Sequence, residues 1–250
     1  MISKEMERNI KENGGIREAF NEARRQKTLY GEENVFDLSI GNPSAPAPRK
    51  VVDVIKKLSE NVNLDHQYMC ESGYEEVRSK IAGWMNQKYK TSYGINNIIM
   101  TNGVAGGLNM VLRALLNPGD EVLVFRPYYP AYIGFAENWN GKIIEVDPGE
   151  DFQPDFEDLE GKITKRTKVV IVNSPHNPTG VIYTKETATK ISEILKSKQK
   201  EYGHAICLLS DEPYRDLVYI EEELPWWPDF YQNTIVSYSF SKSLSLAGER

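Results

Sequence analysis

The sequence predicts an α/β protein in which a mainly parallel sheet is sandwiched by helices. From about residue 97 onward, short apolar segments alternate with helical ones. The predicted strands are almost continuously apolar, as in sheets that are covered on both faces. The 250 residues are 40% hydrophobic and 26% charged, which suits a globular domain with a sizeable core.

Composition argues against several classes of protein. The net charge of −6 does not favour nucleic acid as a partner. Cys70 and Cys207 form neither a disulfide framework nor a metal-ligand spacing, so we expect a reducing compartment and no metal. The N-terminus lacks the apolar core of a signal peptide, and no apolar run approaches membrane-spanning length. We therefore expect a cytoplasmic protein with no membrane or nucleic-acid partner.

The first ninety residues contain fewer strand signals than the rest. Residues 1–30 are charged and carry apolar residues at helical spacing, and residues 35–40 alternate like a short strand. The segment 41–48 is rich in proline and breaks regular structure. The pattern predicts an amphipathic helix over residues 49–61 and a second helix that ends near residue 90.

The remaining chain predicts six strands, at residues 98–101, 121–125, 142–146, 168–173, 205–210 and 234–239. Helices are predicted over residues 104–116, after residue 132, and over residues 184–200, where Thr184 is the expected N-cap.

Polar and aromatic residues follow most of these strands, where ligands bind in parallel α/β sheets. Each has an ordinary structural explanation by itself: Gly103 suits a turn, Asp211 suits a helix cap, and His176 is more typical of a structural role. The glycines near Gly103 do not have the spacing of a dinucleotide fingerprint. The combination at successive strand ends is what indicates a site. Its members are Gly103, Val104, Ala105, Tyr129, Asn177, Asp211, Tyr214 and Lys242.

Pyridoxal 5′-phosphate accounts for this set. Lys242, flanked by Ser241 and Ser243, suits a Schiff-base lysine, and Asp211 suits the partner that keeps the pyridine nitrogen protonated. Asn177 and Tyr214 suit donors to the ring oxygen. Tyr129 can stack on the ring. Phosphate would be held by the amides of Gly103, Val104 and Ala105 and by Ser239, Ser241 and Arg250.

The chain resembles the fold-type I pyridoxal-phosphate aminotransferases of the aspartate aminotransferase-like group, from about residue 37 to residue 250. The most specific motifs are Asn-Ser-Pro-His-Asn-Pro-Thr-Gly at 173–180, Ser-Asp-Glu-Pro-Tyr at 210–214 and Ser-Phe-Ser-Lys-Ser-Leu-Ser-Leu-Ala-Gly-Glu-Arg at 239–250. Shorter matches are Ser-Ile-Gly-Asn-Pro at 39–43, Thr-Asn-Gly-Val-Ala at 101–105, Asn-Pro-Gly-Asp-Glu-Val at 117–122 and Pro-Tyr-Tyr-Pro-Ala-Tyr at 127–132.

The resemblance implies transfer of an amino group from an amino acid to a 2-oxo acid through a Lys242 aldimine, with Lys242 then moving the proton. It implies that Asp211 pairs with the pyridinium, that Asn177 and Tyr214 contact the ring oxygen, and that Ser239 and Arg250 bind phosphate. It further implies a homodimer in which Tyr68 reaches the phosphate of the neighbouring subunit. Gly41 and Asn177 are the matching substrate-binding positions.

The resemblance also suggests a division into domains. Residues 1–45 match an N-terminal arm and a small-domain segment, and residues 46–250 match the large cofactor-binding domain without its C-terminal end. The family continues into a C-terminal small domain with an arginine for the substrate α-carboxylate, and that domain lies outside these 250 residues. Either the 250 residues are therefore part of a longer enzyme, or the chain lacks this substrate clamp. Ala105 departs from relatives that carry a cation there, which favours neutral or aromatic amino donors over aspartate.

Two other functions fit the same residues. A pyridoxal-phosphate-dependent C–S β-lyase shares nearly all of them and would release pyruvate and ammonia. A cofactor-sensing regulatory domain is the non-enzyme alternative, although residues 1–36 show no helix-turn-helix pattern and no strong basic excess.

Overall fold

The computed structural model describes residues 1–13, 15–61, 68–221 and 223–248. It divides into two compact units, Met1–Pro46 and Ala47–Arg250. No helix of the described residues is long and apolar enough to cross a membrane.

The first unit consists of helices α1 (Lys4–Asn13) and α2 (Gly15–Tyr30), the short 3-10 turn η1 (Glu32–Asn34) and an extended tail. The predicted strand over residues 35–40 is wrong. The described part of this unit contains no strand with which it could pair, and the tail instead makes side-chain contacts. The Asp37 carboxylate accepts hydrogen bonds from Ser39 and lies 3.1 Å from Lys27 Nζ.

The second unit is built on a five-stranded parallel sheet, which confirms the predicted fold class. Its strands are β1 (Glu121–Phe125), β2 (Lys142–Val146), β3 (Thr167–Asn173), β4 (Cys207–Asp211) and β5 (Thr234–Ser237). They pair in the order β2-β1-β3-β4-β5, and every pair is parallel.

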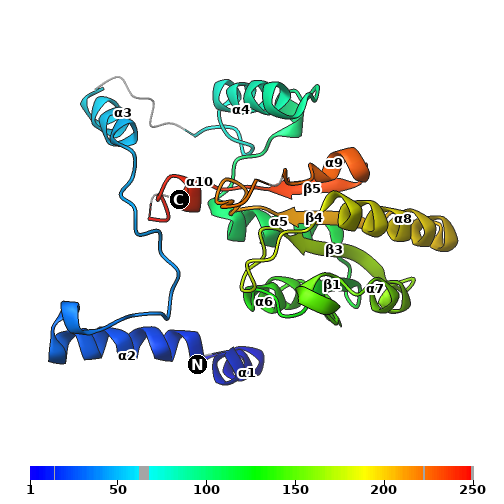
Figure 1. Ribbon diagram of the computed structural model, residues 1–250, viewed down its shortest axis with the longest axis horizontal. Coiled ribbons are helices and arrows are strands. Elements are labelled where there is room, and N and C mark those ends of the chain that lie inside the picture. The colour runs from blue at the N-terminus through cyan, green and yellow to red at the C-terminus, as the bar shows by residue number, and fades with distance from the viewer. Residues whose placement is uncertain (14, 62–67, 222, 249–250) are drawn as a thin grey trace. The chain divides into compact units, whose positions relative to one another are not determined.

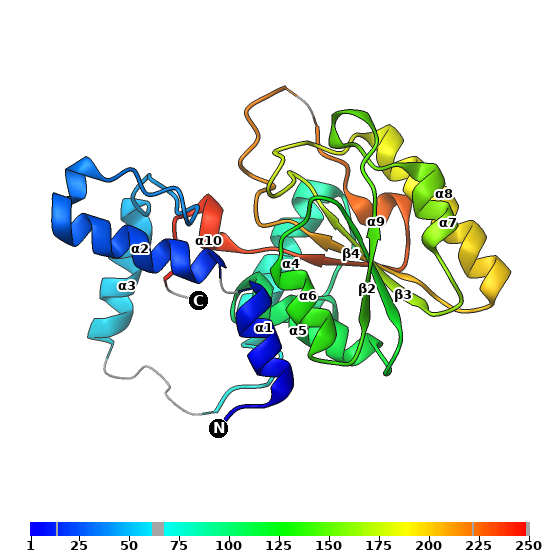
Figure 2. The ribbon, with the colours of Figure 1, turned by 90° about the horizontal axis from the view of Figure 1, so that it is seen from below.

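Both faces of the sheet are buried because successive side chains of a strand point to opposite faces. Leu123 and Val170 belong to one core cluster with α7 and α8, whereas Val122 and Val169 belong to another with α5 and α6. Figure 2 shows α7 and α8 on one side of the sheet and α5 and α6 on the other. This two-sided burial explains why the strands read as continuously apolar.

From β1 onward, helices alternate with the strands of the second unit, as predicted (Figure 1). The helices of this unit are α3 (Arg49–Glu60), α4 (Glu75–Tyr89), α5 (Gly103–Leu115), α6 (Ala131–Glu137), α7 (Phe156–Lys162), α8 (Lys185–Tyr202), α9 (Trp227–Phe230) and α10 (Phe240–Ser243), with 3-10 turns η2 (Ile95–Asn97) and η3 (Glu150–Phe152). Thr184 is the N-cap of α8, as predicted, and its hydroxyl accepts a hydrogen bond from Thr187 N.

Two strand predictions fail near the edge of the sheet. Residues 98–101 form no strand in the structure, and Met100 N instead donates a 3.0 Å hydrogen bond to Ser72 O. The predicted strand over residues 234–239 ends at Ser237. There the chain turns into α10, which contains Lys242.

Candidate functional site

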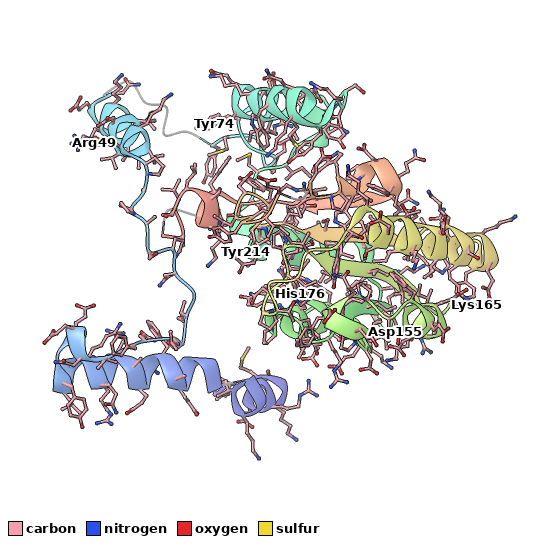
Figure 3. The ribbon with its side chains drawn as sticks, viewed as in Figure 1. Arg49, Tyr74, Asp155, Lys165, His176 and Tyr214 are labelled. Atoms are coloured by element: carbon pink, nitrogen blue, oxygen red, sulfur yellow. The ribbon has the colours of Figure 1, made fainter. Side chains whose placement is uncertain are left out.

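The carboxyl ends of the parallel strands meet at one edge of the sheet. Asn173, Asp211 and Ser237 end three adjacent strands in matching register. The chain leaves β1 for β2 on one side and returns to β3 on the other, and such a reversal of strand order opens a crevice at the carboxyl ends. Figure 3 shows Tyr214 and His176 at this end of the sheet and Lys165 at the opposite end.

Asp211 is the most unusual charged group at this edge. It is buried at the end of β4, and its Oδ2 accepts a 2.5 Å hydrogen bond from the Tyr132 hydroxyl. Its Oδ1 is also buried and accepts no hydrogen bond from any residue that the structure describes. The pKa of Asp211 is raised from 3.8 to about 7, mainly by burial; the Tyr132 hydrogen bond lowers it in part, and the nearby charge of Glu212 contributes to the rise. A buried carboxylate oxygen without a donor is costly unless a ligand supplies one.

The adjacent carboxylate has a different environment. Glu212 is fully buried, but it forms an ion pair with Arg215 and accepts a 2.7 Å hydrogen bond from Ser210 Oγ. Arg215 also donates to Pro225 O at 2.6 Å and packs over the stacked rings of Tyr89 and Trp226. Glu212 therefore has a complete structural role, and Asp211 does not.

A short hydrogen-bond chain links the ends of β3 and β4. Asn173 Nδ2 donates to Asp211 O at 2.7 Å, and its Oδ1 accepts from Asn177 N at 2.7 Å. Asn177 Nδ2 in turn donates to the Tyr214 hydroxyl at 3.3 Å. The structure thus brings Asn177 and Tyr214 together beside Asp211, as expected of two groups that contact one ligand atom.

Aromatic rings from the segment after β1 cover this region. The rings of Tyr129 and Tyr132 meet edge to face with centroids 5.7 Å apart. Tyr132 is buried, and burial, followed by the charge of Asp211, raises its pKa well above the ordinary value. Its hydroxyl therefore stays protonated and donates to Asp211.

Lys242 lies on α10, directly after the end of β5. Its Nζ is 6.0 Å from the centroid of the Tyr214 ring. The N-cap of α10 is Ser239, whose Oγ accepts from Ser241 N at 3.1 Å and lies 2.7 Å from Ser241 Oγ. The amine and the two serine hydroxyls therefore belong to one helical turn.

The start of α5 packs against the end of β5. A Cβ atom on Gly107 would lie 3.2 Å from Thr101 Oγ1 and 3.3 Å from Ser237 Oγ. Gly103, the first residue of α5, has a φ of 68°, a conformation that glycine adopts without strain. The amides at this N-terminus are suited to an anion, and α5 is long enough to orient a dipole toward it.

Two cavities adjoin this region. One of about 510 Å³ is lined by Gly103, Ser239 and Ser241 and by apolar side chains of α4, β5 and residues 98–100, but not by Asp211, Tyr214 or Lys242. Another of about 410 Å³ is lined by Tyr68, Thr101 and Asn102. Both lie next to the expected phosphate cradle rather than over the carboxylate.

The other predicted residues are placed as follows. Val104 is half-buried and packs against the core cluster that contains Leu108 and Leu112 of α5, and Ala105 is exposed. Tyr68 is fully exposed, and Gly41 belongs to the first unit. Arg250 lies outside the described residues. His176 is buried, its pKa is lowered to about 4 by burial, and its Nδ1 lies 2.9 Å from Thr179 Oγ1.

Sequence reasoning missed two members of the site. The sequence indicated Tyr132 only as the last residue of the motif at 127–132, and Asn173 only as the end of a strand. A polar side chain that ends a fully apolar strand is the signal that could have identified Asn173. No cluster of His, Cys, Asp and Glu suited to a metal occurs among the described residues.

Comparison with known proteins gives one consistent family. A family model described as aminotransferase class I and II matches residues 33–250. The chain is similar to an aspartate aminotransferase of Thermotoga maritima, with 31% identity over 233 residues, 92% of this chain and 60% of the relative. It is also similar to a glutamate-pyruvate aminotransferase of Escherichia coli K12, with 33% identity over 236 residues, 90% of this chain and 55% of the relative.

Solved structures agree with the sequence matches. An amino transferase from Eubacterium rectale superposes with a TM-score of 0.92 at 40% identity, over 100% of this chain and 64% of that one. The chain thus spans less than two thirds of the length of each of these relatives.

Proposed function

Since the chain belongs to the class I and II aminotransferase family, we propose that it carries the pyridoxal 5′-phosphate site of an amino-acid aminotransferase. Such an enzyme moves an amino group from an amino acid to a 2-oxo acid. The observation that carries the proposal is the buried Asp211 Oδ1, which accepts no hydrogen bond from the described residues. A protonated pyridine nitrogen is the donor that this oxygen lacks.

The donor set fits this cofactor on three further counts. Lys242 supplies an amine 6.0 Å from the Tyr214 ring, on the turn that also carries Ser239 and Ser241. Asn177 and Tyr214 form a hydrogen-bonded pair that can donate to one oxygen atom. The N-terminus of α5 offers backbone amides to a phosphate.

Each residue has a distinct task in this proposal. When bound, pyridoxal phosphate supplies the electron sink that stabilises a carbanion at the substrate Cα. Asp211 holds a proton on the ring nitrogen, and Tyr129 covers the ring. Asn177 and Tyr214 donate to the ring oxygen. The amides of Gly103, Val104 and Ala105, together with Ser239, Ser241 and Arg250, hold the phosphate.

Lys242 has two tasks. Its Nζ would hold the cofactor covalently, and the same amine, when free, could take a proton from the substrate Cα. Gly41 and Asn177 are the proposed substrate-binding residues. We also propose a cytoplasmic homodimer in which Tyr68 of each subunit contacts the phosphate bound by the other.

An assay of products tests the proposed reaction. Incubation with cofactor, an amino acid and a 2-oxo acid should yield the new amino acid in proportion to the new oxo acid. Formation of pyruvate and ammonia from a thioether amino acid, without transfer, would favour the β-lyase instead. Binding of the cofactor without turnover of either substrate would favour the sensing role.

We infer the preferred class of amino donor from the side chain at Ala105. This exposed position carries no cation for a distal carboxylate, so we expect neutral or aromatic amino acids to react faster than aspartate. Single-turnover rates across a panel of amino acids measure this preference. A clear preference for aspartate would contradict it.

A further inference from the structure

The helical turn that carries Lys242 is too short to hold its own shape. α10 has four residues, and an isolated helix of that length is unstable because nucleation fixes several residues for each hydrogen bond gained. Its geometry must therefore come from contacts at its ends. At the N-terminal end, Ser239 provides one such contact by capping Ser241 N.

The C-terminal end is held by a chain of side chains from other elements. The Tyr238 hydroxyl lies 3.1 Å from Ser243 Oγ and donates a short hydrogen bond to Asp216 Oδ2. Asp216 Oδ1 in turn accepts a 3.2 Å hydrogen bond from Lys88 Nζ on α4. This chain, Lys88–Asp216–Tyr238–Ser243, reaches the residue next to Lys242.

The direction of each hydrogen bond follows from the protonation states. Burial favours a higher pKa for Asp216, but the bonds from Tyr238 and Lys88 outweigh burial and lower it, so the carboxylate is ionised and only accepts. Burial and the Asp216 bond raise the pKa of Tyr238 to about 12, so its single proton points to Asp216. Ser243 must then donate its own proton to the Tyr238 oxygen.

The Tyr238 ring reinforces the same connection. It meets the Phe240 ring edge to face at 5.4 Å and lies 6.3 Å from the Trp84 ring of α4. Lys88 Nζ lies 4.8 Å from the centroid of the Trp84 ring. Tyr238 therefore joins α4, the segment after β4 and the Lys242 turn at one point.

We propose that Tyr238 and Asp216 are positioning residues that fix the direction of Lys242 by tethering the C-terminal end of α10 through Ser243. The inference rests on the proposed function, because it concerns the amine that attaches the cofactor. It adds residues that do not touch the reacting atoms. It predicts that loss of one hydroxyl distant from the ligand slows covalent attachment.

The test follows that attachment in cofactor-free protein. Condensation of the Lys242 amine with the cofactor aldehyde releases one water, and borohydride then reduces the carbon–nitrogen bond to a stable secondary amine. Timed quenching and peptide mass spectrometry give the rate of labelling at Lys242. We expect Tyr238→Phe, which keeps the ring, to slow this rate by about three- to tenfold because the amine is less well oriented.

Three variants separate positioning from general stability. Ser243→Ala should reproduce the slow labelling, and Ser243→Thr should restore it because threonine keeps the hydroxyl. Tyr202→Phe is the matched control: its hydroxyl donates to Ile163 O at 3.1 Å near the C-terminal end of α8, so its loss should leave the labelling rate unchanged. Tyr238→Phe combined with Ser243→Ala should be no slower than either alone, since both remove one interaction.

The outcomes distinguish the two proposals. Absence of label on Lys242 in the unaltered protein would overturn the proposed function itself. Normal labelling in the unaltered protein, with equal rates for Tyr238→Phe and Tyr202→Phe, would overturn the positioning role and leave the function intact. A slow Ser243→Thr variant would also contradict the tether.

Discussion

At the residue scale, two neighbouring carboxylates have different roles because their surroundings differ. Asp211 and Glu212 are adjacent and both buried. Glu212 is neutralised by Arg215, and removal of either partner would leave an uncompensated buried charge. Asp211 has only a tyrosine donor and one buried oxygen without a hydrogen bond from the described residues. Glu212 therefore stabilises the fold, whereas Asp211 is available to a cationic ligand.

The raised pKa of Asp211 predicts how stability depends on pH without cofactor. Between its ordinary value near 3.8 and about 7, the unfolded chain releases this proton and the folded protein keeps it. The folded state binds more protons, so its stability falls as pH rises through this interval. Asp211→Asn does not titrate. Relative to it, the unaltered protein should lose about 3 kcal/mol between pH 4 and 7, at about 1.4 kcal/mol per pKa unit.

Denaturant unfolding of both proteins at several pH values measures this difference. Saturating cofactor should reduce the slope for the unaltered protein, because the pyridinium stabilises the ionised carboxylate. A stability difference that does not vary with pH would contradict the raised pKa.

Tyr132 provides a second prediction at this scale. Tyr132→Phe removes the hydroxyl that donates to Asp211 Oδ2 and keeps the buried ring. A hydrogen bond to a charged group contributes roughly 1.5–3 kcal/mol, so the affinity for pyridoxal phosphate should fall about ten- to a hundredfold. Equilibrium titration measures it. Tyr231→Phe is the control, because it removes another buried tyrosine hydroxyl, bonded to Ile206 O, from the opposite core cluster. Equal affinities in the two variants would contradict a specific role for Tyr132.

At the scale of elements, the contact between α5 and β5 depends on one glycine. A Cβ on Gly107 would press on Thr101 and Ser237, whereas a Cβ on Gly106 would meet only Asn102 Cβ at 3.6 Å. Alanine raises helix propensity at either position by up to about 1 kcal/mol. Gly106→Ala should therefore be neutral or stabilising. Gly107→Ala should displace the start of α5 and weaken cofactor binding. Denaturant unfolding and cofactor titration of the two variants measure this difference. Equal stability and equal cofactor affinity in both would contradict a close contact of Gly107 with Thr101 and Ser237.

The sequence predicted those helices and strands whose formation depends on neighbouring residues in the chain. The apolar runs of β1, β3 and β4 and the N-cap at Thr184 follow from pattern and capping chemistry, and the structure confirms them. Residues 35–40 and 98–101 have strand-like patterns but no ladder in the structure, because pairing depends on distant residues that a local pattern does not contain. The strand predicted over residues 234–239 was two residues too long, and the α10 turn after it has only four residues, too few for helix propensity to identify it as a helix.

The candidate site, like the fold, could be predicted from the sequence only in part. Parallel topology alone brings the strand-end residues Asn177, Asp211 and Lys242 to one edge, so their proximity could be anticipated. The contact of Tyr132 with Asp211 joins residues 79 positions apart, and it depends on how the segment after β1 folds back. No spacing in the sequence encodes that contact.

At the scale of the whole molecule, the proposed dimer can be tested by complementation. Neither Tyr68→Phe nor Lys242→Ala should bind the cofactor normally by itself. If Tyr68 acts across the interface, a mixed dimer contains one site with its own Lys242 and a partner subunit that retains Tyr68. Mixing the two variants should therefore restore tight binding to part of the sites, measured by cofactor titration. No recovery in a mixture shown to form mixed dimers would mean that Tyr68 acts within its own subunit or not at all.

The most direct measurement of the central claim is the site of covalent attachment. The protein is saturated with pyridoxal phosphate, reduced with borohydride and digested, and the modified peptide is sequenced by mass spectrometry. The account predicts a single pyridoxyl group on Lys242, with weaker labelling when Asp211 is replaced by asparagine. A label on another lysine, or no label at all, would contradict it.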